Sequence, residues 1–281
     1  MSEGVYKSRQ GQKVVESFYR QILTAHSSSA FTQLFIQTEI ARTHVLRFGE
    51  TGKPPLVMLH GSAANSAVWL GNIADFIDHF CIYCVDIPGE PGLSEPIRCS
   101  LKTDAPYRWL ASLLDHLAID KSSFATMSLG SWYGLNFAIR SSERVKALSM
   151  MTTPGIVPAK AGFILKALVF AMLGSAGQRL LSKTIYHKTK VPPQVLEFQG
   201  IVSKHFHPVL ETIPIFTDTE LAKITIPVQF FGGDHDALIN SVKTGARLKR
   251  LLPHSEIHIL QDTGHAIIDQ FSAVKDFLLS H

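Results

Sequence analysis

The most informative segment of the sequence is Phe124-Ala125-Thr126-Met127-Ser128-Leu129-Gly130-Ser131-Trp132-Tyr133-Gly134. A short apolar run reaches Ser128 with small residues around it, and a helical pattern follows at once. This order predicts a strand, a sharp turn and a helix, with Ser128 at the apex, an arrangement called a nucleophile elbow. Such turns usually read Gly-x-Ser-x-Gly, but here Thr126 stands at the first Gly position. The alternative is an ordinary strand-to-helix connection in which Ser128 only caps the helix.

The composition indicates one globular domain with a sizeable core and room for an inserted subdomain, since 46% of the 281 residues are hydrophobic and 18% are charged. A net charge of +4 without a Lys/Arg stripe does not indicate nucleic-acid binding. We expect no membrane span, because no apolar run reaches about 18 residues. Three cysteines and no apolar signal region near Met1 favour a cytoplasmic protein. Cys81 and Cys84 should point to opposite faces of a strand, as free thiols.

Periodicity along the chain predicts alternating strands and helices. Residues 13–23 have helical spacing and predict an amphipathic helix outside the main fold. Residues 38–48 alternate like a strand, as one arm of a hairpin. Further strands are expected at 56–59, 80–85, before Ser128, and at 145–151, 226–231 and 256–260; helices are expected at 68–77, 105–117, 128–139, 242–252 and 269–279. Such alternation predicts an α/β fold whose mostly parallel sheet carries helices on both faces.

The alternation stops between Pro154 and Lys223, where only helical stretches occur, at 163–173, 177–184 and 194–205. We therefore expect a helical cap at 154–223, inserted into a core formed by 1–153 and 224–281, with 1–30 as an N-terminal helical extension. An insertion at this place covers the edge of the sheet where ligands bind in α/β folds. His205 and His207 have no third ligand nearby in sequence, so we interpret them as cap residues and not as a metal site.

Three chemically useful segments follow predicted strands. His60-Gly61-Ser62 can present backbone N–H groups, so Ser62 and Leu129 are the predicted donors of an oxyanion hole, and His60 is a structural residue. Ser128, an acid after Gly233 and His265 occur in the order of a Ser-acid-His triad, in which the serine needs a base and the histidine needs a carboxylate. Chemistry alone leaves Asp234 and Asp236 both open as the acid.

With these segments the chain resembles the α/β-hydrolase superfamily from about Thr38 to its end. The resemblance rests on 59–62, Asp86-Ile-Pro-Gly through Ser94, Met127-Ser128-Leu129-Gly130, Gly233-Asp-His-Asp236 and Gly264-His265. The segment Phe216-Thr-Asp-Thr-Glu-Leu221 and the N-terminal helix are similar to carboxylesterases of the NP type. The resemblance implies Asp236 as the acid, by its spacing from Gly233, with Asp234 and Asp262 as loop residues.

The resemblance further implies a serine hydrolase with the triad Ser128, Asp236 and His265 and without cofactor or metal. Its expected substrate is a small, largely apolar carboxylic ester, since the cap is rich in Phe, Leu, Ile and Met. The alternatives are thioester, lactone or carbon–carbon bond hydrolysis, perhydrolysis, or a non-catalytic ligand-binding protein. Dehalogenase and epoxide hydrolase relatives are disfavoured, because they carry Asp where this chain has Ser128.

Overall fold

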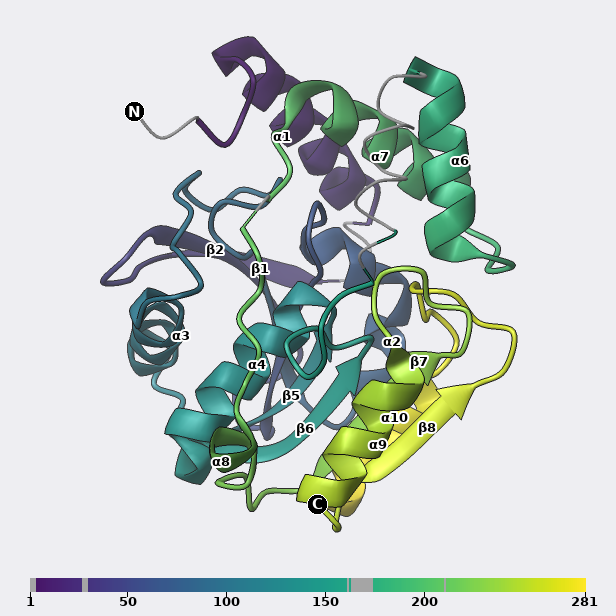
Figure 1. Ribbon diagram of the computed structural model, residues 1–281. Helices are drawn as coiled ribbons and strands as arrows, with labels where there is room; N and C mark the ends of the chain where they lie inside the picture. The colour runs from purple at the N-terminus through teal and green to yellow at the C-terminus, as the bar shows by residue number, and fades with distance from the viewer. Residues whose placement is uncertain (1–3, 27–29, 161, 163–173, 210) are drawn as a thin grey trace.

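A computed structural model, which describes residues 4–26, 30–160, 162, 174–209 and 211–281, gives the chain one sheet of eight strands (Figure 1). The strand order is β1-β2-β4-β3-β5-β6-β7-β8. The pairs β1–β2 and β2–β4 are antiparallel, and every later pair is parallel. The bounds are β1 (Phe31–Gln37), β2 (Arg42–Phe48), β3 (Pro55–Leu59), β4 (Cys81–Val85), β5 (Ser122–Met127), β6 (Val145–Met151), β7 (Val228–Gly233) and β8 (Glu256–Leu260).

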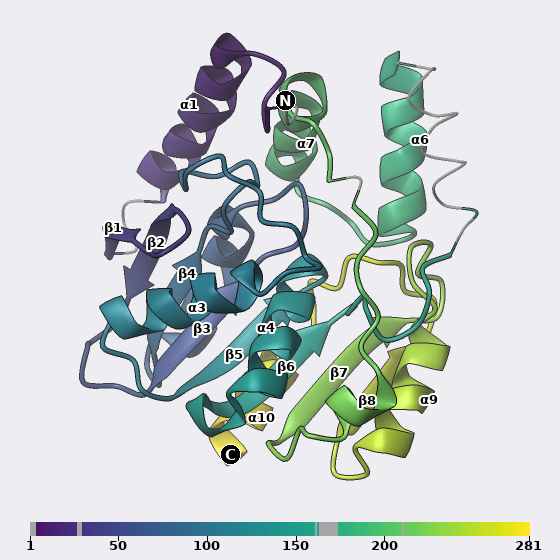
Figure 2. The same cartoon turned by 60° about the vertical axis from the view of Figure 1, so that its left-hand side comes forward.

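Helices cover both faces of this sheet (Figure 2). Their bounds are α1 (Arg9–Ala25), η1 (Ser66–Asn72), α2 (Ile73–Phe76), α3 (Ala105–His116), α4 (Leu129–Arg140), η2 (Ser142–Arg144), α6 (Gly174–Tyr186), α7 (Pro193–His205), α8 (Asp218–Leu221), α9 (Ser241–Leu251) and α10 (Phe271–Ser280), where η marks 3₁₀ helices. The predicted helix at 68–77 is instead η1 followed by the short α2. Gly71 and Asn72 stand in its middle, and both are poor helix formers. None of the helices in the described part of the chain combines the length and the apolar composition that a membrane span requires.

The core is divided by the sheet into two apolar layers. Trp109 of α3, Leu135 of α4 and Leu248 of α9 pack on one face. Trp69 of η1 and Val274 of α10 pack on the other. Cys81 and Cys84 are free and buried, and they fall in different layers, which confirms the prediction that these two positions, three apart on β4, point to opposite sides. The predicted α/β architecture is confirmed.

The predicted strand at 38–48 is shorter than expected and begins at Arg42, as the second arm of a β1–β2 hairpin. The preceding residues form the turn. The Thr38 hydroxyl donates to the Ala41 carbonyl over 2.7 Å and accepts the Ala41 N–H over 3.1 Å. A threonine side chain that bonds its own backbone competes with strand pairing, so the ladder cannot extend through Thr38.

The carboxylate of Asp86, at the end of β4, joins distant parts of the core. It accepts hydrogen bonds from the Tyr19 hydroxyl at 3.2 Å, His44 Nδ1 at 2.7 Å and the Ser66 N–H at 2.8 Å. Burial alone would raise the pKa of Asp86, but the charge and hydrogen bond of His44 outweigh it and hold this pKa well below its usual range. The ionised carboxylate therefore links α1, β2 and η1.

Between β6 and β7 the described residues form helices and loops and contain no sheet strand, as predicted. The helices α6 and α7 stand beyond the carboxyl ends of the parallel strands, and α7 lies beside α1 (Figure 2). The expected helix at 163–173 lies outside the described residues. The division into a core and a cap at 154–223 stays a prediction.

The N-terminal helix is less separate than expected. Tyr19 and Leu23 of α1 are buried in the apolar layer that also contains Trp69. One turn before Tyr19, Val15 is buried with Val202 of α7, and the Phe18 ring stacks on Phe198 at a centroid distance of 6.1 Å. Helix α1 therefore contacts both the core of the sheet and α7.

Candidate active site

Ser128 occupies the turn between β5 and α4 in a backbone conformation that side chains rarely adopt, with φ 46° and ψ −115°. Its N–H donates to the Met151 carbonyl of neighbouring β6 over 2.8 Å, which holds the turn against the sheet. A strained residue between a buried strand and a buried helix projects its side chain beyond the sheet edge. The predicted elbow geometry is present.

The glycines around Ser128 have no room for a larger side chain. A Cβ on Gly130 would lie 2.3 Å from the Leu59 carbonyl oxygen, and one on Gly61 would lie 3.3 Å from Ser128 Cβ. Helix α4 can therefore press against the end of β3 only because position 130 carries no side chain. The same close approach places the loop after β3 next to Ser128.

Thr126, the departure from the usual elbow, is accommodated behind the turn. Its side chain is fully buried, and its hydroxyl donates to the Ser149 carbonyl over 3.0 Å. A Cβ on Gly134 of α4 would lie 3.1 Å from Thr126 Cγ2. The absence of a side chain at position 134 therefore gives room to the branched side chain of Thr126. Ser131 Oγ lies 3.0 Å from Thr126 Oγ1 and is buried against the sheet. Ser131 thus faces the sheet.

The three side chains expected to form a triad lie in one hydrogen-bonded chain. His265 Nε2 lies 3.0 Å from Ser128 Oγ, and His265 Nδ1 lies 2.8 Å from Asp236 Oδ2. The Asp236 carboxylate is buried, and its other oxygen accepts the N–H groups of Leu238 at 2.8 Å and Ile239 at 3.1 Å. All three follow parallel strands, β5, β7 and β8, so the sheet brings them to one edge.

The other carboxylates considered for the acid position are held elsewhere. Asp234 Oδ1 accepts His235 Nδ1 at 2.8 Å and the Thr263 N–H at 3.2 Å. Asp262 bonds to His187 and Lys188. Within the residues that the structure describes, neither carboxylate reaches His265.

The backbone N–H groups of Ser62 and Leu129 have no acceptor in the described part of the chain. Ser62 follows Gly61, which borders Ser128, and Leu129 is the first residue of α4. An N–H in the first turn of a helix has no intrahelical acceptor, so it remains available to a ligand. Both donors thus belong to segments next to the serine.

His60 is a structural residue, as predicted. Its Nε2 accepts the Ile87 N–H at 3.0 Å, and its Nδ1–H donates to the Gly61 carbonyl at 2.8 Å. Complete burial lowers the pKa of His60, which favours the neutral ring that these two bonds require. The ring fixes the loop after β3 and is not free to act as a base.

Glu90 is a buried residue of the site that the sequence reasoning did not single out. Its Oε2 accepts the Ala63 N–H over 2.6 Å, and Ala63 has a positive φ of 55°. Burial raises the pKa of Glu90 to about 7, although the Ala63 hydrogen bond and the Arg98 charge act in the opposite direction. The signal for it in the sequence was a carboxylate inside the Gly/Pro-rich segment after Asp86.

A cavity of about 120 Å³ opens beside Leu129, lined by Leu101, Tyr133 and Val209 and by the charged Glu90, Arg98 and Glu211 among others. The charged groups are engaged: Arg98 Nε donates to the Gly89 carbonyl at 3.2 Å, and Glu211 accepts from Ser100 Oγ at 2.6 Å. The free lining is therefore mainly apolar. A larger hollow of about 260 Å³ lies at the β1 edge of the sheet, whereas Ser128 follows the central β5.

The inserted segment touches the loop that carries His265. The His265 N–H donates to the Ile185 carbonyl over 2.9 Å, and a Cβ on Gly264 would lie 2.6 Å from the same oxygen. The end of α6 thus packs directly on the predicted base.

Comparison with known proteins agrees with this architecture. The family model described as alpha/beta hydrolase fold matches residues 54–179. The uncharacterized carboxylesterase nap of Bacillus subtilis is 29% identical over 242 residues, covering 83% of this chain and 80% of that protein. The crystal structure of carboxylesterase CesB (YbfK) from Bacillus subtilis has a TM-score of 0.83 and 26% identity, covering 96% of this chain and 98% of that one.

A second solved structure, naproxen esterase (carboxylesterase NP) from Bacillus subtilis, has a TM-score of 0.81 and 26% identity, covering 94% of this chain and 95% of that one. These likenesses extend across both the sheet and the inserted helices. They agree with the resemblance to NP-type carboxylesterases that the sequence indicated. The chain has the α/β-hydrolase fold and is a carboxylesterase-like enzyme, similar over most of its length to these Bacillus subtilis proteins.

Proposed function

We propose that this protein is a serine hydrolase that cleaves small, largely apolar carboxylic esters through an acyl-enzyme. The observation that carries the proposal is the hydrogen-bonded chain from Ser128 through His265 to Asp236, with the serine on a strained turn. The named carboxylesterases among its relatives support the same substrate class.

In the proposed reaction His265 Nε2 takes the proton of Ser128 Oγ as the oxygen attacks the ester carbonyl carbon. The buried Asp236 carboxylate keeps the proton on Nδ1 and stabilises the imidazolium. The tetrahedral oxyanion accepts the N–H groups of Ser62 and Leu129. The C–O bond to the leaving group then breaks, and His265 returns the proton to the departing alcohol.

The second half of the reaction repeats the first with water as the nucleophile. His265 takes a proton from water, hydroxide adds to the acyl carbon, and Ser128 Oγ leaves with that proton while the carboxylic acid departs. Asp236 acts through its rigid placement, since the N–H groups of Leu238 and Ile239 hold the oxygen that does not contact His265.

The cavity beside Leu129 supports the proposal of a small substrate. Its volume of about 120 Å³ lies below the range of about 300 Å³ and above that accommodates drug-sized ligands. Leu101, Tyr133 and Val209 offer apolar contact while the neighbouring charged groups are bonded within the protein. A compact acyl group with few polar atoms suits such a lining.

Active-site labelling tests the proposal. A fluorophosphonate phosphonylates an activated serine, which intact-protein mass spectrometry detects as one added adduct. We expect the adduct on the native protein and on Ser131→Ala, whose hydroxyl faces the sheet, and its loss in Ser128→Ala. Absence of the adduct from the native protein would indicate a ligand-binding protein instead. Hydrolysis assays with matched esters, thioesters and lactones then separate ester cleavage from the other reactions of this fold; a preference for a thioester or lactone would overturn the substrate class.

A further inference from the structure

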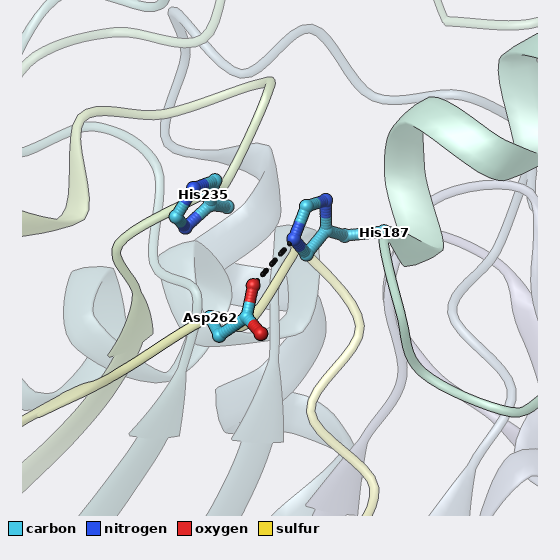
Figure 3. Close-up of side chains that lie close together, drawn as sticks. All are labelled: His187, His235 and Asp262. Carbon is cyan, nitrogen blue, oxygen red and sulfur yellow. Dashed lines mark hydrogen bonds and ion pairs between the residues drawn. The ribbon is translucent and has the colours of Figure 1, made fainter.

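Two histidines and an aspartate meet where the inserted segment touches the loops that carry Asp236 and His265 (Figure 3). His187 follows the end of α6, His235 lies in the loop after β7, and Asp262 lies in the loop after β8. One possible ligand atom from each side chain lies within 4.8 Å of the other two. Three separate chain segments therefore supply nitrogen and oxygen donors to one point.

The present contacts of this cluster are hydrogen bonds and ring stacking. His187 Nε2 lies 2.9 Å from Asp262 Oδ1, and the rings of His187 and His235 stack with centroids 4.6 Å apart. Lys188 contacts the other oxygen of Asp262. Asp262 Oδ1 therefore faces the two histidines, while Oδ2 contacts Lys188.

An outer carboxylate fixes the tautomer of His235. Asp234 Oδ1 lies 2.8 Å from His235 Nδ1 and also accepts the Thr263 N–H at 3.2 Å. An Nδ1–H that donates to Asp234 leaves the lone pair of His235 on Nε2. Histidines that bind metals commonly donate their second nitrogen to a carboxylate in this way, which orients the ring and raises its basicity.

We propose that His187, His235 and Asp262 bind a divalent transition-metal ion of the zinc class. Two imidazoles and one carboxylate are donors that Zn²⁺ accepts, and a water molecule completes four-coordination. This proposal replaces the expectation, drawn from the sequence, that the chain has no metal site. His205 and His207 are not part of it.

Binding requires a small rearrangement. A metal–nitrogen bond lies in the plane of the imidazole, so two nearly parallel rings cannot both point at one ion, and one ring must turn about its Cβ–Cγ bond. Ligand atoms at Zn–N and Zn–O distances of about 2.0–2.1 Å in a tetrahedron stand about 3.4 Å apart. The ion replaces the proton between His187 Nε2 and Asp262, and that proton passes to solvent.

A metal ion at this site would hold the inserted segment against the core loops and would take no part in cleaving the ester bond. His235 precedes Asp236 in sequence, and a Cβ on Gly264 would lie 2.9 Å from His187 Cβ. An ion held by one residue of the insertion and two residues of the core loops joins these segments. Because an ion that binds only the folded state stabilises it, thermal stability should rise with free metal concentration.

Calorimetric titration of the chelator-treated protein with Zn²⁺ tests the proposal. We expect one equivalent to bind, with affinity falling at least about tenfold in His187→Ala, His235→Ala and Asp262→Asn. Asp234→Asn should weaken binding by about 10- to 100-fold while the three ligands remain. His207→Ala is the matched control and should bind as the native protein does.

Cobalt substitution adds a readout that does not depend on activity. Co²⁺ in a four-coordinate site gives strong visible absorption, which should appear with the native protein and His207→Ala and be absent from His187→Ala. Thermal unfolding of each metal-free variant shows whether it is folded. Absence of saturable binding to the native protein would overturn the proposal, as would equal binding by folded His187→Ala.

Discussion

Glu90 Oε2 accepts the N–H of Ala63 over 2.6 Å, and Ala63 holds a positive φ of 55° directly after Ser62. A side chain that is almost fully buried thus fixes the backbone beside a predicted oxyanion donor. A non-glycine residue in the left-handed region persists only where its surroundings hold it. The hydrogen bond from Ala63 to the Glu90 carboxyl group is such a contact, so we expect the ionisation of Glu90 to affect folding stability.

Stability should therefore depend on pH through Glu90. Its pKa is raised from 4.5 to about 7 in the folded protein, so between these values the folded state keeps a proton that the unfolded chain releases. Folding stability must then fall as pH rises through this window. Glu90→Gln cannot ionise. As pH rises from 4.5 to 8, the free energy of unfolding of this variant should therefore increase relative to that of the native protein by up to about 3 kcal/mol. Urea unfolding of both proteins across this range measures the difference; parallel pH profiles would contradict the assignment.

The two neighbouring carboxylates after β7 should differ sharply in their effect on activity. Asp236→Asn removes the carboxylate that contacts His265 Nδ1, and we expect kcat to fall by about 10⁴-fold. Asp234→Asn, whose side chain contacts His235 and Thr263, should cost far less. Steady-state kinetics on an aryl ester gives the ranking, and the reverse ranking would move the acid to Asp234.

The length of the acyl chain should have an optimum at a few carbons. Each additional methylene buried against Leu101, Tyr133 or Val209 contributes roughly 0.8 kcal/mol, or about fourfold in kcat/KM, until the cavity is full. Longer acyl chains no longer fit the cavity, so kcat/KM should fall. A series of aryl esters that differ only in acyl length provides the measurement. A maximum at long chains with activation at an oil–water interface would indicate a lipase instead.

Gly130→Ala should prevent the native elbow from forming. Its Cβ would lie 2.3 Å from the Leu59 carbonyl oxygen and 2.6 Å from that of His60, both backbone atoms that cannot turn aside. We expect loss of several kcal/mol of stability or failure to fold. Gly200→Ala in α7 is the matched control, because a Cβ there meets nothing within 4 Å, and it should stabilise the helix by about 0.5–1 kcal/mol. Thermal unfolding compares the two, and similar effects would contradict the packing argument.

The order of elements was open to prediction because short-range patterns determine it. The apolar run before Ser128, the small residues after it and the polar segments after neighbouring strands are local features, and they indicated the sheet, the elbow and the expected site residues. Where prediction fell short, the cause was also local. Thr38 bonds its own turn in place of extending the strand, and Gly71 interrupts an expected α-helix.

Contacts between distant segments were decided by the tertiary structure. The sequence offered Asp234 and Asp236 two residues apart, but only the folding of β7 against β8 brings Asp236 to His265 in the described chain. The room that Gly134 leaves for Thr126 likewise depends on how a helix lies on a strand.

The proposed metal-binding cluster could not be predicted from the sequence for the same reason. His187, His235 and Asp262 are separated by 48 and 27 positions, and no spacing in the sequence marks them as a group. Hydrophobic periodicity specifies which face of each element is buried, whereas the meeting of side chains on different loops depends on the path of the whole chain. Local patterns were therefore enough to predict the fold and the triad residues, whereas the buried position of Glu90 and the grouping of the side chains proposed to bind a metal ion depend on contacts between distant segments.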